Sequence, residues 1–172
     1  QVLIYPYYTV RTVPTGVVGT DAAYNSLLSV VNSTASAKAV KVRFLEGKNS
    51  REVLDFNLYL SAKDVWTTAI IPTTDGAGIF TADKSCTVPK VSNSSTSPTP
   101  FVNYAFTGSN DDKGGTSLDR TREGYAEIIE MGDVIGSTAT AATHGSSGVP
   151  PCTESALAAP VAPPNTVTGT SG

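Results

Sequence analysis

A chain of 172 residues is long enough to form one domain with a single hydrophobic core. Hydrophobic residues make up 40% of it and charged residues only 16%, below the about 25% of average globular proteins, and serine, threonine, glycine and proline take their place, as is typical of extracellular β-proteins. The net charge of −3 excludes a general nucleic-acid surface, which is normally basic, and no apolar run reaches the about 20 residues that span a membrane.

The first expected element is an extended strand over residues 2–10, which are rich in β-branched and aromatic types. Pro6 lacks an amide donor and suits a sheet edge or a bulge. Contiguous apolar surface favours association, so we expect this run to pack in its own sheet or in the groove of a neighbouring subunit, with a slight preference for the neighbour. The side chains of this expected assembly strand are Val2, Leu3, Ile4, Tyr5, Tyr7, Tyr8 and Val10.

The clearest pattern lies in two neighbouring runs, residues 39–45 and 53–60, where apolar and polar side chains alternate. Successive side chains of a strand point to opposite faces of a sheet. The two runs therefore predict an antiparallel hairpin with one buried and one solvated face. Phe44 and Phe56 are expected in the core, and Tyr59 is expected on the solvated face.

Short elements and turns fill the rest of the chain. In chain order we expect strands over residues 26–31 and 64–71, a loop over 92–100, strands over 101–107 and 124–131, and a helical turn over 139–143. Prolines and small residues predict a tail or linker at residues 150–172, after a domain of residues 1–149. Short strands without a long amphipathic helix predict an all-β fold, an antiparallel immunoglobulin-like sandwich of about seven strands with extended loops.

Two cysteines, Cys86 and Cys152, lie far apart in the sequence and outside any metal-binding spacing. In an oxidising compartment a disulfide between them is expected, with two unrelated thiols as the alternative. The sequence begins at Gln1, as after removal of an export signal peptide or in a trimmed chain. We therefore expect an extracellular or cell-surface protein.

Several segments resemble a recurrent layout of uncharacterised secreted bacterial surface proteins, in which a strand ending in Asn precedes a hairpin and an L-x-L strand leads to a short turn. The segments that carry it are residues 27–32, 39–45, 54–60, 64–67 and 118–132. The resemblance covers roughly residues 1–150 and implies an immunoglobulin-like sandwich at the cell surface. It implies no catalytic or binding residue.

Catalytic chemistry has few candidates in the sequence. The single histidine, His144, lies among small residues and is expected in a solvent-exposed loop. A Ser/His/Asp triad depends on geometry, and the sequence contains no nucleophile-elbow motif. Glu123, Glu127 and Glu130 can flank a sugar only from within a cleft, and ion pairs at a solvated strand edge are the stronger interpretation. We expect no enzyme activity and no cofactor.

The best ion-binding candidate is the acidic loop at residues 110–119, because calcium needs several hard oxygen ligands on a flexible turn. Its candidate ligands are Asp111, Asp112 and Asp119. Lys113 opposes a cation and the EF-hand spacing is absent, so we expect a plain acidic surface loop without metal. The basic side chains of the hairpin are expected to pair with acidic neighbours across the strands.

Two functions remain after these exclusions. The first is a non-enzymatic structural subunit of an extracellular filament or surface layer, in which copies of the chain assemble by strand addition. The alternative is a monomeric cell-surface recognition module that binds carbohydrate or another surface protein through its loops. Aromatic side chains that can supply stacking platforms for the alternative are Tyr5, Tyr7, Tyr8, Tyr59 and Trp66.

Overall fold

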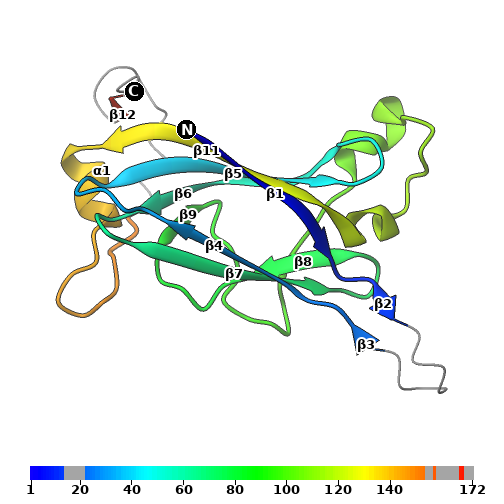
Figure 1. The fold of residues 1–172 in the computed structure, drawn as a ribbon, viewed down its shortest axis with the longest axis horizontal. Coiled ribbons are helices and arrows are strands. Elements are labelled where there is room, and N and C mark those ends of the chain that lie inside the picture. Colours follow the sequence, from blue (N-terminus) through cyan, green and yellow to red (C-terminus); the bar gives the residue numbers. More distant parts are fainter. Residues whose placement is uncertain (14–21, 154–156, 158–166, 169–172) are drawn as a thin grey trace.

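The computed structural model describes residues 1–13, 22–153, 157 and 167–168, which form mostly β-structure (Figure 1). All strand pairs in these residues are antiparallel. The larger sheet contains, in spatial order, β1 (Val2–Thr9), β11 (Glu123–Val134), β5 (Lys38–Glu46), β6 (Glu52–Leu60) and β9 (Cys86–Val88), with β12 (Val167–Thr168) also beside β11. The smaller sheet contains β10 (Thr99–Pro100), β8 (Ala77–Phe80), β7 (Val65–Pro72) and β4 (Ser26–Val31), and a separate pair contains β2 (Thr12–Val13) and β3 (Ala22–Ala23).

Helical segments are short and lie at the two ends of the sheets (Figure 1). They are α1 (Gly136–Ala142) and the 3-10 helices η1 (Tyr104–Phe106), η2 (Gly108–Asn110) and η3 (Leu118–Arg122). None of the helices in the described part of the chain has the length and apolar character needed to cross a membrane.

The hairpin of β5 and β6 forms where the sequence alternates apolar and polar side chains. Val42 pairs with Phe56 and Phe44 with Leu54, and the rings of Phe44 and Phe56 stack at 6.5 Å between centroids. Both rings are almost fully buried. The predicted hairpin and its two core phenylalanines are confirmed.

The two sheets face each other across one hydrophobic core. The ring of Phe56 in the larger sheet meets Trp66 of the smaller sheet edge-on, with 5.7 Å between centroids. Ile79 of β8 is fully buried in the same cluster. Each such side chain contributes about 1.5–3 kcal/mol of stabilisation by leaving water. The core therefore joins the larger sheet to the smaller one.

A smaller apolar cluster covers one end of the outer face of the larger sheet. Tyr59 of β6 lies in it beneath α1 and Leu157, and its hydroxyl donates to the carbonyl of Leu157 at 2.9 Å. The expectation that Tyr59 faces solvent is wrong, because the chain after β11 folds back over this face. The predicted disulfide between Cys86 and Cys152 is present and closes the same cluster.

The irregular segments depart most from the expected elements. Residues 101–107 do not form a strand: Phe101 is buried in the core and the 3-10 helix η1 follows. The short strands β8 and β9 were not predicted, because Gly78 lies within β8 and Pro89 directly follows the three residues of β9. In the predicted tail at residues 150–172, the described parts contact the domain through the disulfide, Leu157 and β12.

Candidate functional site

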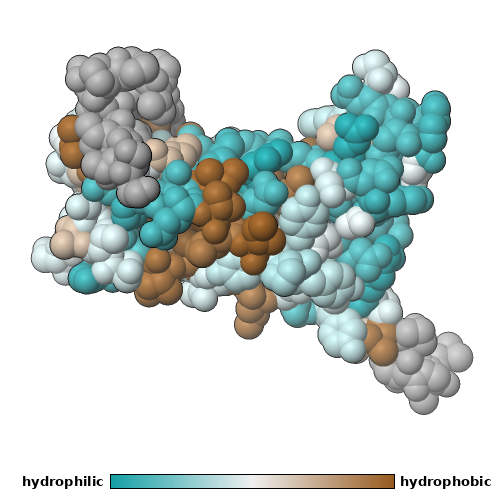
Figure 2. Space-filling view, turned by 45° about the horizontal axis from the view of Figure 1, so that its top comes forward, coloured by the Kyte–Doolittle hydropathy of each residue, from teal (hydrophilic) through white to brown (hydrophobic). Residues whose placement is uncertain are grey.

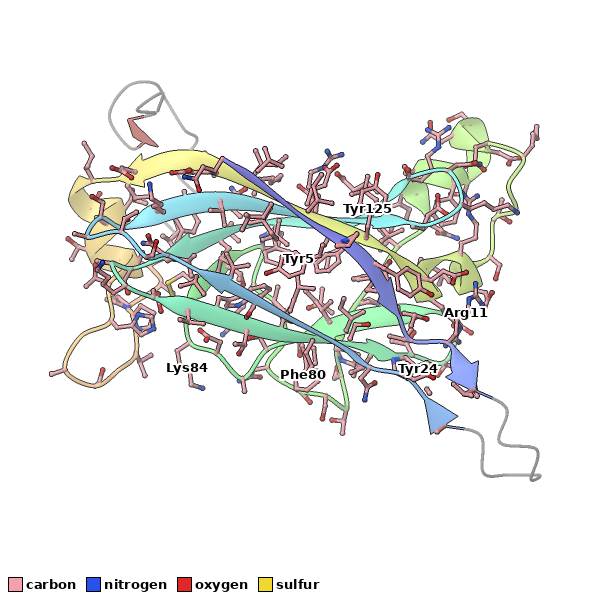
Figure 3. All side chains as sticks on the ribbon, in the orientation of Figure 1. Tyr5, Arg11, Tyr24, Phe80, Lys84 and Tyr125 are labelled. Carbon is pink, nitrogen blue, oxygen red and sulfur yellow. A yellow bond between two sulfur atoms is a disulfide. The ribbon has the colours of Figure 1, made fainter. Side chains whose placement is uncertain are left out.

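The edges of the two sheets meet along one side of the molecule, where β1 and β4 run past each other in opposite directions (Figure 1). At one end Ser26 holds the strands together, since its hydroxyl donates to the Thr9 carbonyl and accepts from the Thr9 amide, both at 3.0 Å. Further along, the Tyr5 hydroxyl donates to the carbonyl of Ser29. Figure 3 shows Tyr5 in the space between the strands. We call this line of contact between residues 1–9 and residues 26–32 the seam.

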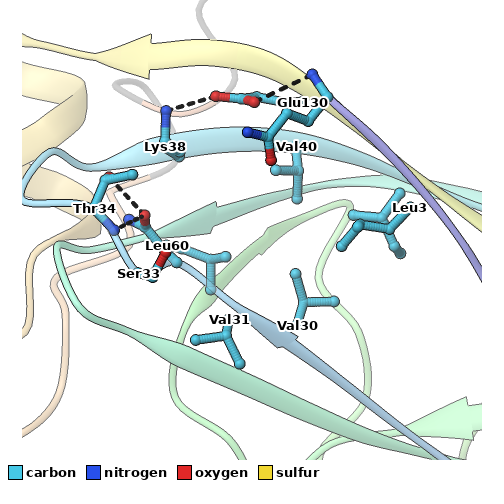
Figure 4. Close-up of a pocket in the computed structure, with 12 residues that line it drawn as sticks. Leu3, Val30, Val31, Ser33, Thr34, Lys38, Val40, Leu60 and Glu130 are labelled. Atoms are coloured by element: carbon cyan, nitrogen blue, oxygen red, sulfur yellow. Dashed lines mark hydrogen bonds and ion pairs between the residues drawn. The ribbon is translucent and has the colours of Figure 1, made fainter.

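Beyond Tyr5 the seam opens into a pocket of about 140 Å³ (Figure 4). Its apolar lining consists of Leu3, Val30, Val31, Val40, Leu60 and Ile128. Lys38 and Glu130 lie on its rim, where the Lys38 ammonium donates to Glu130 and to Asp133. The hydrogen bond to Asp133, and after it the one to Glu130, raises the pKa of Lys38. The rim therefore carries charged groups that neutralise one another. The pocket thus has an apolar lining and an ion pair on its rim.

Backbone groups of β1 point into the open side of the seam. The amide of Glu130 donates to the carbonyl of Gln1 at 2.9 Å, so these two residues form a hydrogen-bonded pair. Hydrogen-bonded and non-hydrogen-bonded pairs alternate along antiparallel strands. Val2 and Ile4, which lie opposite Ile129 and Glu127, therefore direct their N–H and C=O groups away from β11.

The edge of β4 has the same character. The amide of Asn32 donates to the carbonyl of Asp64 at 2.8 Å, which fixes the alternation along β4 and β7. By the same rule Leu27, Ser29 and Val31 direct their backbone groups outward. The bond from Tyr5 to the Ser29 carbonyl agrees with this assignment. The seam is therefore bordered on both sides by strand edges.

Apolar side chains remain exposed along these edges. On β1 the exposed fractions are 58% for Val2, 47% for Leu3 and 63% for Ile4, and on β4 Leu27 is 80% exposed. Figure 2 shows hydrophobic side chains gathered in the middle of this face, between hydrophilic surfaces. Natural edge strands usually carry charges, prolines or bulges that block pairing. Residues 1–10 contain no charged side chain, and the blocking features of β1 are Pro6 and the bulge around it, which leave Val2 and Ile4 open.

Six of the seven residues of the expected assembly strand divide into two groups, and the seventh, Tyr7, is exposed at the bulge. Tyr8 and Val10 are fully buried in the protein's own core, and Tyr5 packs against it. Val2, Leu3 and Ile4 lie at the seam. In the structure of the single chain, β1 occupies the edge of its own larger sheet, and its register shifts between Tyr5 and Tyr8, around Pro6.

The candidate calcium ligands are each engaged by a basic side chain. Asp111 binds Lys113, Asp119 binds Arg11 and Arg122, and Asp112 binds Arg51 and Arg120. The Arg120 hydrogen bond, followed by that of Asn49, lowers the pKa of Asp112. Across the described ranges no group of three acidic, histidine or cysteine side chains is arranged to hold a metal. Arginine guanidinium groups thus form ion pairs with two of the three candidate ligands, Asp112 and Asp119.

A buried ion pair behind this loop was not anticipated from the sequence. The side chain of Glu46 is fully buried and accepts hydrogen bonds from the backbone amides of Lys48, Asn49 and Arg51. Arg120 donates to the same carboxylate at 2.9 Å. Glu46 and Arg120 are 74 residues apart, so no local pattern reveals the pair.

His144 is less exposed than predicted, because its loop folds against the turn after β6. Its Nδ1 lies 3.0 Å from the Ser61 hydroxyl and 3.5 Å from a carboxylate oxygen of Asp64. Ser61 also donates to Asp64 through its amide and its hydroxyl. A catalytic triad needs the serine and the carboxylate on opposite ring nitrogens, whereas here both lie at the same nitrogen. The cluster anchors a loop and does not form a relay.

The three glutamates of β11 are also engaged in ion pairs. Glu123 binds Arg11 at 2.9 Å, and Glu127 binds Arg43 at 3.1 Å. Glu130 binds Lys38, and the hydrogen bond from Lys38 lowers the pKa of Glu130. The basic side chains of the hairpin pair across the strands as expected, Lys41 with Asp55 and Arg43 with Glu52.

Most of the aromatic residues considered as stacking platforms are buried. Tyr8, Tyr59 and Trp66 belong to the two apolar clusters, in agreement with the more common role of such strand residues in a core. Tyr7 is 61% exposed and borders a shallow pocket of about 570 Å³. Other residues that line this pocket are Arg11, Glu123 and Tyr125.

No protein-family model, curated protein or solved structure matches the chain. The seam remains the most distinctive feature of the described residues, because it combines exposed apolar side chains with backbone groups aimed outward. The apolar run at residues 2–10 predicted the part of the seam that β1 supplies. The contribution of β4 was missed, since a sequence pattern does not show which strands end a sheet.

Proposed function

We propose that the protein is a non-enzymatic extracellular structural subunit that assembles with copies of itself by strand addition, as part of a surface filament or layer. The observation that carries the proposal is the seam, where two sheet edges present outward-directed backbone groups beside exposed apolar side chains. In strand addition, main-chain hydrogen bonds supply affinity, and pockets for alternate side chains supply specificity. The pocket beyond Tyr5 suits the second role.

Two further observations support an extracellular setting. A disulfide between Cys86 and Cys152 is typical of oxidising compartments. The two facing antiparallel sheets support the extension of the proposal to an immunoglobulin-like sandwich of the kind found in secreted bacterial surface proteins. Export after removal of a signal peptide is part of the same proposal.

The test places a charge on the open edge of β1. Ile4→Lys should reduce self-association, because a second strand that pairs with the edge of β1 would have to desolvate the lysine ammonium. The folded monomer should keep its stability, since Ile4 is 63% exposed and lies opposite Glu127, which can accept the ammonium. Light scattering over a concentration series, with negative-stain imaging, measures the assembly state.

Val149→Lys is the matched control, because Val149 is 50% exposed and lies outside the seam, among residues that line a pocket beside the disulfide. It should assemble like the unmodified protein. An unmodified protein that stays monomeric at high concentration would contradict the proposal. Such a monomer would favour the recognition module, for which the pocket beside Tyr7 and Tyr125 offers aromatic faces next to charged groups.

A further inference from the structure

The part of the β1 edge that is free to pair is short and sharply limited. Val2 and Ile4 direct their backbone groups outward, while those of Thr9 are already bonded to the Ser26 hydroxyl. Pro6 lies between them and has no N–H to donate. The open edge therefore offers two complete donor and acceptor sets, separated by Leu3.

Resting on the proposed function, we propose that the seam binds a second copy of this chain by antiparallel pairing of the two β1 edges about a two-fold axis. In this pairing, Val2 of each copy forms a hydrogen-bonded pair with Ile4 of the other. Leu3 of each copy then faces Leu3 of its counterpart. The arrangement makes four backbone hydrogen bonds, two for each pair.

No alternative register makes four bonds between complete donor and acceptor sets. A shift that places Val2 opposite Val2 of the second copy puts Ile4 opposite the position before Gln1, so only one hydrogen-bonded pair lies within residues 1–10. A shift in the other direction centres Ile4 on the axis and places Val2 opposite Pro6, which can accept a hydrogen bond but cannot donate one, so each of these two outer pairs is incomplete and lies at the register shift around Pro6. A slip by one residue sets outward-directed groups against inward-directed groups. Pro6 therefore favours the register that is centred on Leu3, in which two complete hydrogen-bonded pairs form.

The side chains of the edge fit the same partner. Leu3 lines the apolar pocket together with Val30 and Val31, so a second Leu3 beside it covers apolar surface that a single chain leaves exposed. Two copies of residues 1–10 bring no charged side chain against another. The rim charges of Lys38 and Glu130 are already paired within one chain. Self-pairing therefore leaves no buried charge without a counterion.

A two-fold contact uses the same patch on both subunits and closes on itself. The seam by itself then makes a dimer. A filament or layer built from this protein needs a second contact elsewhere on the molecule. The dimer is accordingly the building unit of the proposed assembly.

Leu3→Cys tests the axis directly. Residues that face each other in a non-hydrogen-bonded pair have Cα atoms about 4.5 Å apart, within the range of a disulfide. Both native cysteines are paired with each other, so the introduced thiol is the single reactive group. Mild oxidation should convert most of Leu3→Cys into a covalent dimer, whereas Val149→Cys, also exposed, should stay monomeric on a denaturing gel.

Ile4→Pro provides a second, independent test. It removes the outward N–H of residue 4 but no hydrogen bond to β11, because that N–H does not face β11. Association should weaken at least tenfold in Ile4→Pro and stay near the original value in Ile4→Val, which keeps the donor. A melting temperature close to that of the unmodified protein, compared at a concentration where both are monomeric, shows that β1 is still in place.

The outcomes separate the two proposals. A protein that assembles in light scattering but yields no Leu3→Cys dimer would overturn the two-fold pairing and leave strand addition standing. Disulfide formation between a Leu3→Cys chain and a Val31→Cys chain, stronger than between two Leu3→Cys chains, would likewise overturn it in favour of β1 pairing with β4. A monomeric protein without any crosslink would overturn both.

Discussion

At the residue scale, the least expected feature is the buried pair of Glu46 and Arg120. Burial by itself raises the pKa of Glu46, but the Arg120 hydrogen bond and three backbone amides outweigh it, and the pKa is lowered below its usual 4.5. The guanidinium of Arg120 also lies 4.2 Å from the centre of the Phe106 ring and binds Asp112. One arginine thus joins the turn after β5, the acidic loop and η1.

Arg120→Met should cost about 3–5 kcal/mol of unfolding free energy at pH 7, because it leaves the Glu46 carboxylate buried without its counterion. The carboxylate keeps its folded-state stabilisation only above its unfolded pKa of about 4.5, and this is lost as the pH falls toward the lowered folded pKa. The penalty of Arg120→Met should therefore be smaller at pH 3 than at pH 7. Urea midpoints at both pH values measure the difference.

Arg43→Met is the control for the exposed case, because Arg43 pairs with Glu52 where both side chains are about a third exposed, at 34% and 37%. Its cost should stay below about 1 kcal/mol at both pH values. Equal losses of unfolding free energy for the two variants would show that the ion pair between Glu46 and Arg120 does not stabilise the acidic loop.

At the scale of elements, the bulge in β1 decides which tyrosine enters the core. The register with β11 shifts between Tyr5 and Tyr8, so Pro6 and Tyr7 lie opposite a single residue, Tyr125. Tyr8 is 1% exposed and donates to the carbonyl of Thr121 at 3.1 Å, whereas Tyr7 is 61% exposed. Strict alternation from Leu3 and Tyr5 places Tyr7 inside instead.

Tyr8→Ala should therefore destabilise the monomer by about 3–5 kcal/mol, and Tyr7→Ala by less than about 1 kcal/mol. The reason is that Tyr8 meets the rings of Phe44 and Phe101 edge-on, at 6.0 and 5.8 Å between centroids. Thermal or urea unfolding of the two variants checks the contrast. The reverse order of losses would mean that β1 is not bulged at Pro6.

At the scale of the whole molecule, the disulfide joins β9 to the chain after α1. Cys86 and Cys152 are 66 residues apart, and the loop between them includes the acidic loop, β11 and α1. The smaller apolar cluster lies directly beside the disulfide. Together they hold the segment after α1 against the outer face of the larger sheet.

Replacing both cysteines with alanine should cost about 4 kcal/mol, the chain-entropy value for a loop of this size. Urea unfolding with and without reductant measures it, since a reductant should lower the stability of the unmodified protein but not that of the double variant. Alkylation before reduction gives an independent check. Two thiols that react freely in the native, unreduced protein would contradict the disulfide.

The sequence alone determined those features that depend on local pattern or on exclusive pairing. The alternation in residues 39–45 and 53–60 fixed the central hairpin, because only one register of a strand buries its apolar side chains. With two cysteines, a disulfide within the chain can only join Cys86 to Cys152, so its partners, though not its formation, followed without geometry. Pro6 indicated an irregular edge strand, because proline has no amide N–H to donate to a neighbouring strand.

Only the tertiary structure decided which surfaces remain open. The seam exists because β1 and β4 end different sheets, and strand order is set by the packing of the whole chain rather than by either strand. Tyr59 is buried because residues about 80–100 positions later in the sequence cover it. Glu46 and Arg120, which form an ion pair, are separated by a similar number of residues. Contacts of such sequence separation leave no periodic trace, since each partner on its own resembles an ordinary surface residue.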